Sequence, residues 1–460
     1  MGDTLDTGRG ILLFVRKASG MKRIVTVGLM SSLLAGCGVF DRGSGPRTPT
    51  IGNRVAVLST DSEIEVDAAL AQTPVTVPAP VANAEWPQPG GNPAKSMTHV
   101  NLGTAPVRQW SVSIGSGSTP SGRLASEPVV AGGRVYTIDT QAVVRAFDAN
   151  SGARVWEQRV RGEQTSRGTL FGGGVSFDNG RVYVTNGAGD AAALDAATGR
   201  QLWIVRPGGP LRGAPTIASG SVYVISQDNQ IFALNAETGR TQWNGTGAVE
   251  LAGVFGTAAP AFAQSTVVAG FSSGELTAYR YENGQVVWQD TLSRTGVSTI
   301  VGNLSDIDAD PVVDNGRVFA VGQGGRMVAV ELVTGQRAWE LNIAGISTPW
   351  VAGEWVFVVT DRAQLLAISR ASGKVRWMKQ LQRYRSPDKA GSGPVFWRGP
   401  LLAGGQLVLA SSVGHLIFLN PADGTTTRNV RQQVGTSLPP VVANGVLYIL
   451  DDQGMLSAYR

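Results

Sequence analysis

Cysteine and histidine are nearly absent from this chain of 460 residues, which contains one cysteine, Cys37, and two histidines, His99 and His415. A single cysteine excludes a disulfide framework within the chain. The three residues together are too few for the Cys and His ligand sets of structural zinc sites. We therefore expect neither a disulfide scaffold nor a zinc centre.

The chain also lacks a strong excess of one charge and any apolar run long enough to span a bilayer. Residues 1–36 carry five Lys/Arg and two Asp/Glu, and the remaining residues carry 34 basic and 32 acidic side chains. This balance does not predict a nucleic-acid-binding surface. What the chain has instead is 60 glycines and 42% hydrophobic residues, a composition typical of an all-β protein with many turns.

The cysteine follows a short apolar segment. Met21 is followed by two basic residues, an apolar run from Ile24 to about Ala35, small residues and then Cys37. This is the order of a secretory signal, and about twelve apolar residues are too few to cross a bilayer. The tetrapeptide Leu-Ala-Gly-Cys at 34–37 resembles the lipobox of bacterial lipoproteins, which implies acylation of Cys37, with palmitate as a typical chain. The alternative is an ordinary signal peptide with a chance cysteine.

These features divide the chain into four parts. Residues 1–20 are predicted to be an over-extended N-terminus, because a complete signal begins at position 21, and residues 21–36 form the lipoprotein signal peptide. Residues 37–82, rich in Pro, Thr, Ser and Asp, are predicted to be the lipidated cysteine and a flexible tether. Glycine, not aspartate, follows the cysteine, which favours lipid anchoring in the outer membrane on the periplasmic face.

One template recurs through the rest of the chain, residues 83–460. Segments such as "ALDAATGRQLW" and "ALNAETGRTQW" place Ala six residues before a turn glycine and Trp four residues after it. The spacing of the copies is close to the 40–50 residues of a propeller blade. The turn glycines are Gly152, Gly199, Gly239, Gly284, Gly335, Gly373 and Gly424, and the last copy has Arg428 in place of Trp.

Each copy is preceded by further strand signals, including the hairpin dipeptides Asn179-Gly180, Asn315-Gly316 and Asn444-Gly445. The final copy ends at Arg460 after its third strand, and "VRQWSVSIG" near position 110 supplies a Trp with no repeat of its own. We therefore predict an all-β, eight-bladed β-propeller with four-stranded antiparallel blades, the last blade closed by the N-terminal strand.

The repeated tryptophans are predicted to be structural, because each can bury about 150–250 Å² at a blade junction. A ligand-stacking role is the alternative. The residues Asp148, Asp195 and Asn235, which precede the turns, are predicted to form those turns. The repeated tryptophans are Trp110, Trp156, Trp203, Trp243, Trp288, Trp339 and Trp377.

The template resembles the repeat of pyrroloquinoline-quinone (PQQ) dehydrogenases over about residues 105–460, which implies the same fold and offers a quinoprotein dehydrogenase as the alternative function. Those enzymes hold a calcium ion, use an Asp base and often carry an adjacent-cysteine disulfide, which this domain cannot form. His99 and His415 are interpreted as surface or packing residues. We predict no catalytic residue, no cofactor and no metal.

The most chemically distinctive stretch is "NLSDIDADPVV", in which Asp306, Asp308 and Asp310 alternate. This opens like a calcium-binding EF-hand loop, but Pro311 stands where glycine is needed and Arg317 where a bidentate glutamate is needed. The stretch is either a solvated acidic turn or a negative patch that recognises a basic partner surface.

Lipobox, tether and eight PQQ-like repeats together resemble the BamB family of lipoproteins, which are subunits of the outer-membrane β-barrel assembly machinery. The resemblance implies a non-catalytic scaffold that binds the periplasmic domains of BamA through Asp306 and Asp308 and assists insertion of barrel proteins. A second contact loop falls at "VELAGVFGTAAP", where the family pattern of leucines and an arginine is replaced by Ala252, Val254 and Phe255. Other subunits and unfolded barrel substrates, bound by strand addition, are further expected partners.

Overall fold

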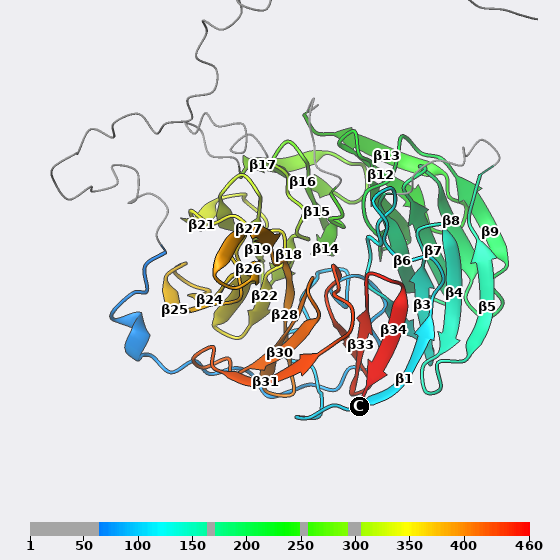
Figure 1. Ribbon diagram of the computed structural model, residues 1–460. Helices are drawn as coiled ribbons and strands as arrows, with labels where there is room; N and C mark the ends of the chain where they lie inside the picture. Colours follow the sequence, from blue (N-terminus) through cyan, green and yellow to red (C-terminus); the bar gives the residue numbers. More distant parts are fainter. Residues whose placement is uncertain (1–63, 163–170, 249–255, 293–304) are drawn as a thin grey trace, which may run out of the picture. The chain divides into compact units, whose positions relative to one another are not determined.

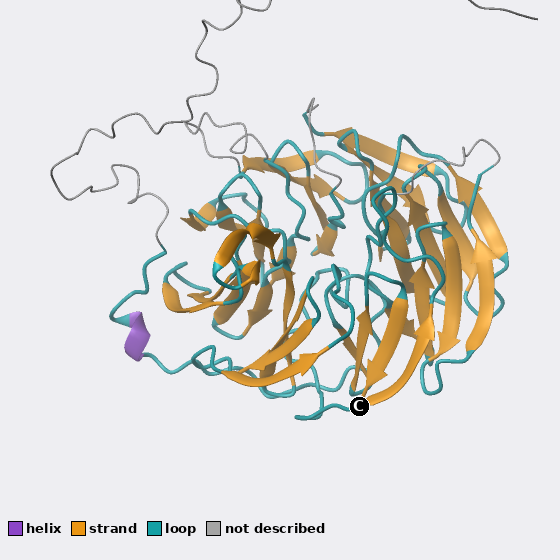
Figure 2. Cartoon of the chain, viewed as in Figure 1, coloured by secondary structure: helices purple, strands orange, loops and turns teal. Residues whose placement is uncertain are grey.

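The computed structural model describes residues 64–162, 171–248, 256–292 and 305–460. Within these ranges nearly all regular structure is β-strand, and the one helix is a 3₁₀ turn, η1 (Leu70–Gln72) (Figure 2). The strands form eight four-stranded sheets arranged in a ring, so the predicted eight-bladed propeller is confirmed (Figure 1). No helix in the described ranges is long and apolar enough to cross a membrane.

The first four blades follow the chain from one to the next. They are blade 1 with β2 (Val129–Ala131), β3 (Arg134–Ile138), β4 (Val143–Asp148) and β5 (Arg154–Arg159); blade 2 with β6 (Gly173–Asp178), β7 (Arg181–Asn186), β8 (Ala191–Asp195) and β9 (Gln201–Val205); blade 3 with β10 (Thr216–Ala218), β11 (Ser221–Ile225), β12 (Gln230–Asn235) and β13 (Thr241–Thr246); and blade 4 with β14 (Ala261–Ala263), β15 (Thr266–Gly270), β16 (Glu275–Arg280) and β17 (Val286–Thr291).

The remaining blades continue the ring, with a separate hairpin between blades 6 and 7. They are blade 5 with β18 (Val312–Asp314), β19 (Arg317–Val321), β20 (Met327–Glu331) and β21 (Arg337–Leu341); blade 6 with β22 (Trp350–Ala352), β23 (Trp355–Val359), β24 (Gln364–Ser369) and β25 (Val375–Gln380); the hairpin β26 (Tyr384–Ser386) and β27 (Lys389–Pro394); blade 7 with β28 (Trp397–Ala403), β29 (Gln406–Ser411), β30 (His415–Leu419) and β31 (Thr426–Arg431); and blade 8 with β32 (Val441–Ala443), β33 (Val446–Leu450), β34 (Met455–Tyr459) and β1 (Arg108–Ser113).

Blade 8 is assembled from the two ends of the repeat region, as predicted. Strand β1 pairs antiparallel with β34, and Trp110 lies opposite Ala458. Two backbone hydrogen bonds between Val107 and Arg460, of 2.8 and 2.9 Å, extend this pairing. The closure gives β34 a partner on both sides and makes β1 the outer strand of blade 8.

The predicted turn residues are confirmed. In the three Asn-Gly hairpins both residues have positive φ, for example 43° at Asn179 and 74° at Gly180, as a tight hairpin turn requires. In the template turns the side chain of Asp148 accepts a hydrogen bond from the backbone N–H of Ser151 at 2.8 Å. Asp195 and Asn235 accept the corresponding bonds from the residues three positions later.

The template glycine and tryptophan meet across blade junctions. The seven turn glycines have φ between 71° and 76°, and a β-carbon at any of them would lie within 2.9 Å of the tryptophan of the preceding blade. Six tryptophans also donate an indole N–H hydrogen bond of 2.7–3.0 Å to a backbone carbonyl of the next blade. The pairs are Trp156 with Ala196, Trp203 with Ala236, Trp243 with Tyr281, Trp288 with Leu332, Trp339 with Arg370 and Trp377 with Pro421.

The one arginine in the tryptophan position faces the split blade. The third and fourth strands of blade 8 come from opposite ends of the repeat region, so no turn glycine is present there to receive an indole. Arg428 instead donates a hydrogen bond to the carbonyl of Pro106 at 3.3 Å and lies 5.5 Å from the centroid of the Phe418 ring. The departure from the template therefore coincides with the site of ring closure.

Residues 83–102, here called the inner segment, contact the first strand of every blade. The first strands are the innermost: their side chains are largely buried. The fourth strands lie outermost, and many of their side chains are exposed. The inner segment partly satisfies the edges that these strands leave unpaired. Its partners are Val442 for Asn83, Val130 for Trp86, Phe177 for Pro87, Ile217 for Gln88, Phe262 for Pro93, Val313 for Ala94, Trp350 for Thr98 and Leu402 for Val100.

The described part of the predicted tether also lies against the ring. Asp67 donates a backbone hydrogen bond to Val375 at 2.9 Å, and its carboxylate lies 2.7 Å from the ammonium of Lys374. Leu70, Val75 and Val77 pack against the core. Residues 64–82 thus differ from the expected free tether, because apolar residues spaced among the prolines and threonines give this stretch surface to bury.

Candidate functional site

The acidic stretch singled out in the sequence lies between blades 4 and 5. Asp306 is only 1% exposed, and one of its carboxylate oxygens lies 2.6 Å from Nη2 of Arg212, which is 0% exposed. The same nitrogen is 3.7 Å from Asp308. Arg212 comes from the connection between β9 and β10, so this ion pair ties the entry to blade 3 to the entry to blade 5.

The buried ion pair is incompletely satisfied. Nε and Nη1 of Arg212 and the second carboxylate oxygen of Asp306 have no hydrogen-bond partner among the described residues. Burial raises the pKa of Asp306 to about 6, although the charge of Arg212 acts in the opposite direction. Asp306 therefore faces the protein interior and does not present its carboxylate to solvent.

Asp308 and Asp310 are fixed by hydrogen bonds to neighbouring blades. Asp308 accepts one from the backbone N–H of Thr257 at 3.1 Å and one from the side-chain amide of Gln323 at 2.9 Å. Asp310 accepts a bond from the backbone N–H of Ala259 at 2.8 Å. The stretch is therefore a junction that connects blades 3, 4 and 5, and not a freely solvated turn.

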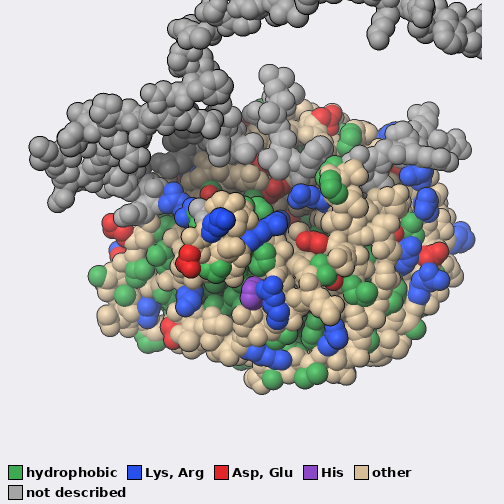
Figure 3. All heavy atoms as spheres, in the orientation of Figure 1, with side chains coloured by type: hydrophobic (Ala, Val, Ile, Leu, Met, Phe, Trp, Pro, Cys, Tyr) green, Lys and Arg blue, Asp and Glu red, His purple; other side chains and the backbone are tan. Residues whose placement is uncertain are grey.

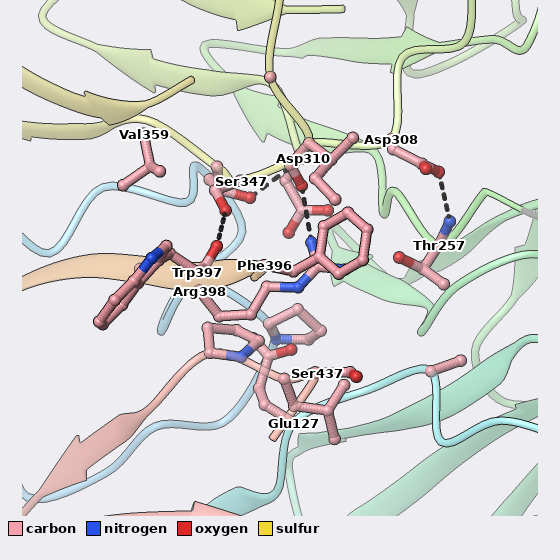
Figure 4. A pocket seen from close by; sticks show the side chains of 18 of the residues that line it. Glu127, Thr257, Asp308, Asp310, Ser347, Val359, Phe396, Trp397, Arg398 and Ser437 are labelled. Carbon is pink, nitrogen blue, oxygen red and sulfur yellow. Dashed lines mark hydrogen bonds between the residues drawn. The ribbon is translucent and has the colours of Figure 1, made fainter. Parts of the chain in front are cut away.

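Asp308 and Asp310 also line a cavity of about 700 Å³ at the centre of the ring, to which the inner segment contributes Trp86 and Lys95. Figure 4 shows Arg398 reaching across this cavity between the side that carries Asp310 and the side that carries Glu127. The volume lies within the roughly 300–1,000 Å³ typical of small-molecule sites.

Three charged side chains beside this cavity, Lys95, Glu127 and Asp310, influence one another's pKa. Lys95 donates to the hydroxyl of Thr216 at 3.0 Å, and Glu127 accepts a hydrogen bond from the backbone N–H of Gly90 at 3.1 Å. Burial lowers the pKa of Lys95 and raises the pKa of Asp310. Burial, with a further contribution from the charge of Asp310, raises the pKa of Glu127 to about 7.

The structure brings Asp306 and Asp308 together but says nothing of the second predicted loop, because Ala252, Val254 and Phe255 lie outside the described residues, as does Cys37. Sequence reasoning did not identify Arg212, Lys95, Glu127 or Arg398. The one local signal for Arg212 is a lone charge in "GGPLRGAPT", a stretch of small and apolar residues.

Neither histidine stands at a group suited to metal binding. His99 is buried and its Nε2 accepts a hydrogen bond from the backbone N–H of Gly405 at 2.8 Å, and His415 bonds to Asn429 on the outer strand. In the described ranges no three His, Cys, Asp or Glu side chains are grouped so as to hold a metal ion. Figure 3 shows Lys and Arg side chains spread over one face among apolar and uncharged ones, with no single basic patch.

Comparison with known proteins identifies relatives along most of the chain. The family model described as outer membrane protein assembly factor BamB matches residues 140–379. The protein of that name from Shigella dysenteriae serotype 1 is 30% identical over 358 residues, covering 76% of this chain and 87% of the relative. The Yersinia pestis protein of that name is 27% identical over 365 residues, covering 77% and 89%.

Solved structures share the fold at lower identity. The crystal structure of BamB from Moraxella catarrhalis has a TM-score of 0.65 at 19% identity, covering 77% of this chain and 100% of that one. Quinohemoprotein alcohol dehydrogenase from Comamonas testosteroni has a TM-score of 0.62 at 15% identity, covering 86% and 82%. At these identities both comparisons concern the fold alone.

Proposed function

Because this chain belongs to the family of the outer membrane protein assembly factor BamB, we propose that it is a non-catalytic scaffold of the outer-membrane β-barrel assembly machinery. In this role it binds the periplasmic domains of BamA and assists the insertion of β-barrel proteins. The observation that carries the proposal is the 30% identity to a protein named as such an assembly factor over 76% of the chain.

The architecture suits a rigid scaffold. Ring closure by β1 and β34, seven tryptophan junctions and an inner segment bonded to all eight blades hold the blades in fixed positions. A surface fixed in this way loses little conformational entropy when a partner binds. Exposed edges of outer strands are further candidates for strand addition by unfolded barrel substrates.

Two aspartates of the acidic stretch have different roles in this proposal. Asp308 keeps 13% of its side chain exposed and is the member of the pair that a partner can reach. Asp306 acts from inside, where its bond to Arg212 sets the path of the loop. The contact surface then includes Asp308.

We expect Asp308→Ala to reduce co-purification of BamA from detergent-solubilised membranes several-fold, with a moderate fall in melting temperature from the lost bonds to Thr257 and Gln323. Asp388→Ala, on the exposed β26–β27 hairpin, is the matched control and should leave both unchanged. The measurement is the ratio of BamA to tagged protein in the eluate, with thermal unfolding of each variant. Equal recovery of BamA by wild type and Asp308→Ala would place the contact on another surface.

We also propose that Cys37 carries the lipid that holds the protein to the periplasmic face of the outer membrane. Stable anchoring requires more than one acyl chain, each contributing about 0.8 kcal/mol per buried CH₂. Cys37→Ser should leave the propeller folded and move it from the membrane fraction to the soluble periplasmic fraction. Retention of this variant on membranes washed with high salt would refute the anchor.

A further inference from the structure

Arg398 supplies an unpaired positive charge at the centre of the ring. Its Nη1 donates a hydrogen bond to the carbonyl of Ile346 at 3.0 Å, and its Nε has no partner among the residues that the structure describes. In the described part of the chain no carboxylate forms an ion pair with it. Its nearest opposite charges, Asp308 and Asp452, act only at longer range, and burial lowers its pKa.

Three carboxylates of the same cavity, at Glu127, Asp308 and Asp310, accept hydrogen bonds from other groups and form no ion pair with Arg398. Asp308 is bonded to Thr257 and Gln323 and lies near Arg212. Asp310 accepts a hydrogen bond from the backbone N–H of Ala259 and interacts electrostatically with Lys95. Glu127 accepts a hydrogen bond from the backbone N–H of Gly90. Among the described residues that line this cavity, the buried side-chain atoms without a partner are both donors, Nε of Arg398 and Nε1 of Trp86.

The wall near Arg398 is apolar. Phe396, two residues before it, is 50% exposed although it lines the cavity, and Leu438, Pro439 and Pro440 line it as well. A half-exposed aromatic ring beside an unpaired guanidinium matches a ligand with an apolar body and one anionic group.

We propose that the central cavity is a binding site for a small monocarboxylate with an aromatic or apolar body, whose carboxylate is held by Arg398. A guanidinium presents parallel N–H donors that fit one carboxylate. Four carboxylates line the same cavity, at Glu127, Asp308, Asp310 and Asp361, and they disfavour a ligand with several negative charges. The proposal does not rest on the contact with BamA, although Asp308 belongs to both surfaces.

The test is isothermal titration of the detergent-solubilised full protein with 1-naphthoate. Saturable binding at one site is expected, with at least ten-fold weaker binding for the neutral analogue 1-naphthamide and for benzene-1,3,5-tricarboxylate. Arg398→Met should weaken binding of 1-naphthoate at least ten-fold. Arg385→Met, on the exposed hairpin, is the matched control and should bind like wild type.

A second variant separates a lost site from a damaged fold. Ala344 is a half-buried residue of the cavity wall, and Ala344→Trp should fill the cavity while keeping Arg398, so it should abolish binding. The proposal is overturned by the absence of saturable 1-naphthoate binding in the millimolar range, by equal binding of acid and amide, or by undiminished binding to a folded Arg398→Met or Ala344→Trp variant.

Discussion

Replacing Arg212 with methionine is expected to lower the free energy of unfolding by about 3–5 kcal/mol, the range for breaking a buried ion pair by removing one partner. The side chain of Arg212 is 0% exposed and lies 2.6 Å from Asp306, itself 2% exposed at the side chain. The substitution leaves a carboxylate buried among Ile307 and neighbouring apolar groups, without its counter-charge. Urea denaturation followed by tryptophan fluorescence measures the change.

The double variant Arg212→Met with Asp306→Leu distinguishes the ion pair from simple packing. Because three polar atoms of the pair have no partner within the described ranges, the net contribution of the pair to stability is small once desolvation is included. The double variant should therefore recover most of the lost stability. Lys374→Met, which removes the exposed pair with Asp67, is the control and should cost about 1 kcal/mol or less. A loss below 1 kcal/mol for Arg212→Met would show that the pair is dispensable.

The fold was predictable because its determinants are local and repeated. Each template places a turn residue, a glycine with positive φ and a tryptophan within about ten residues, so each blade can be recognised from its own segment of sequence. Ring closure could be predicted because Trp110 has no repeat of its own and the final copy lacks its fourth strand. Such signals survive in the sequence because the contacts that they make are the same at each junction.

The candidate site was predictable only in part. The alternation of Asp306, Asp308 and Asp310 is visible, but the burial of Asp306 depends on Arg212, which lies 94 residues earlier. Nothing within either stretch marks them as partners. The position of the inner segment could not be predicted from the sequence either. It pairs one or two residues at a time with eight different strands and has no periodicity of its own. Long-range contacts made once leave no repeated pattern.

Truncating a tryptophan of the repeat should lower the free energy of unfolding by about as much as replacing Arg212 with methionine does. Trp243 is 7% exposed, donates its indole N–H to Tyr281 at 2.7 Å and packs between the rings of Tyr223 and Tyr279, with centroids 5.9 and 5.8 Å away. Trp243→Ala opens a cavity at the junction of blades 3 and 4. The expected loss is about 3–5 kcal/mol, as for other buried aromatic truncations.

The glycine beneath the indole provides an internal test of this junction. A β-carbon on Gly284 would lie 2.6 Å from the ring of Trp243, and its φ of 71° strains any other residue. Gly284→Ala should therefore destabilise the wild type through both the clash and the strain. In the Trp243→Ala background only the strain remains, about 1–2 kcal/mol, so the two losses should sum to more than the loss of the double variant.

Arg428 supplies the contrast, since it occupies the tryptophan position where no turn glycine follows. It is half-buried, and its contacts are a hydrogen bond of 3.3 Å to Pro106 and the face of Phe418. Arg428→Ala should cost about 1 kcal/mol, the size of a partly exposed cation–π contact. If it cost as much as Trp243→Ala under the same denaturation conditions, the stability of a junction would not depend on the indole-on-glycine contact.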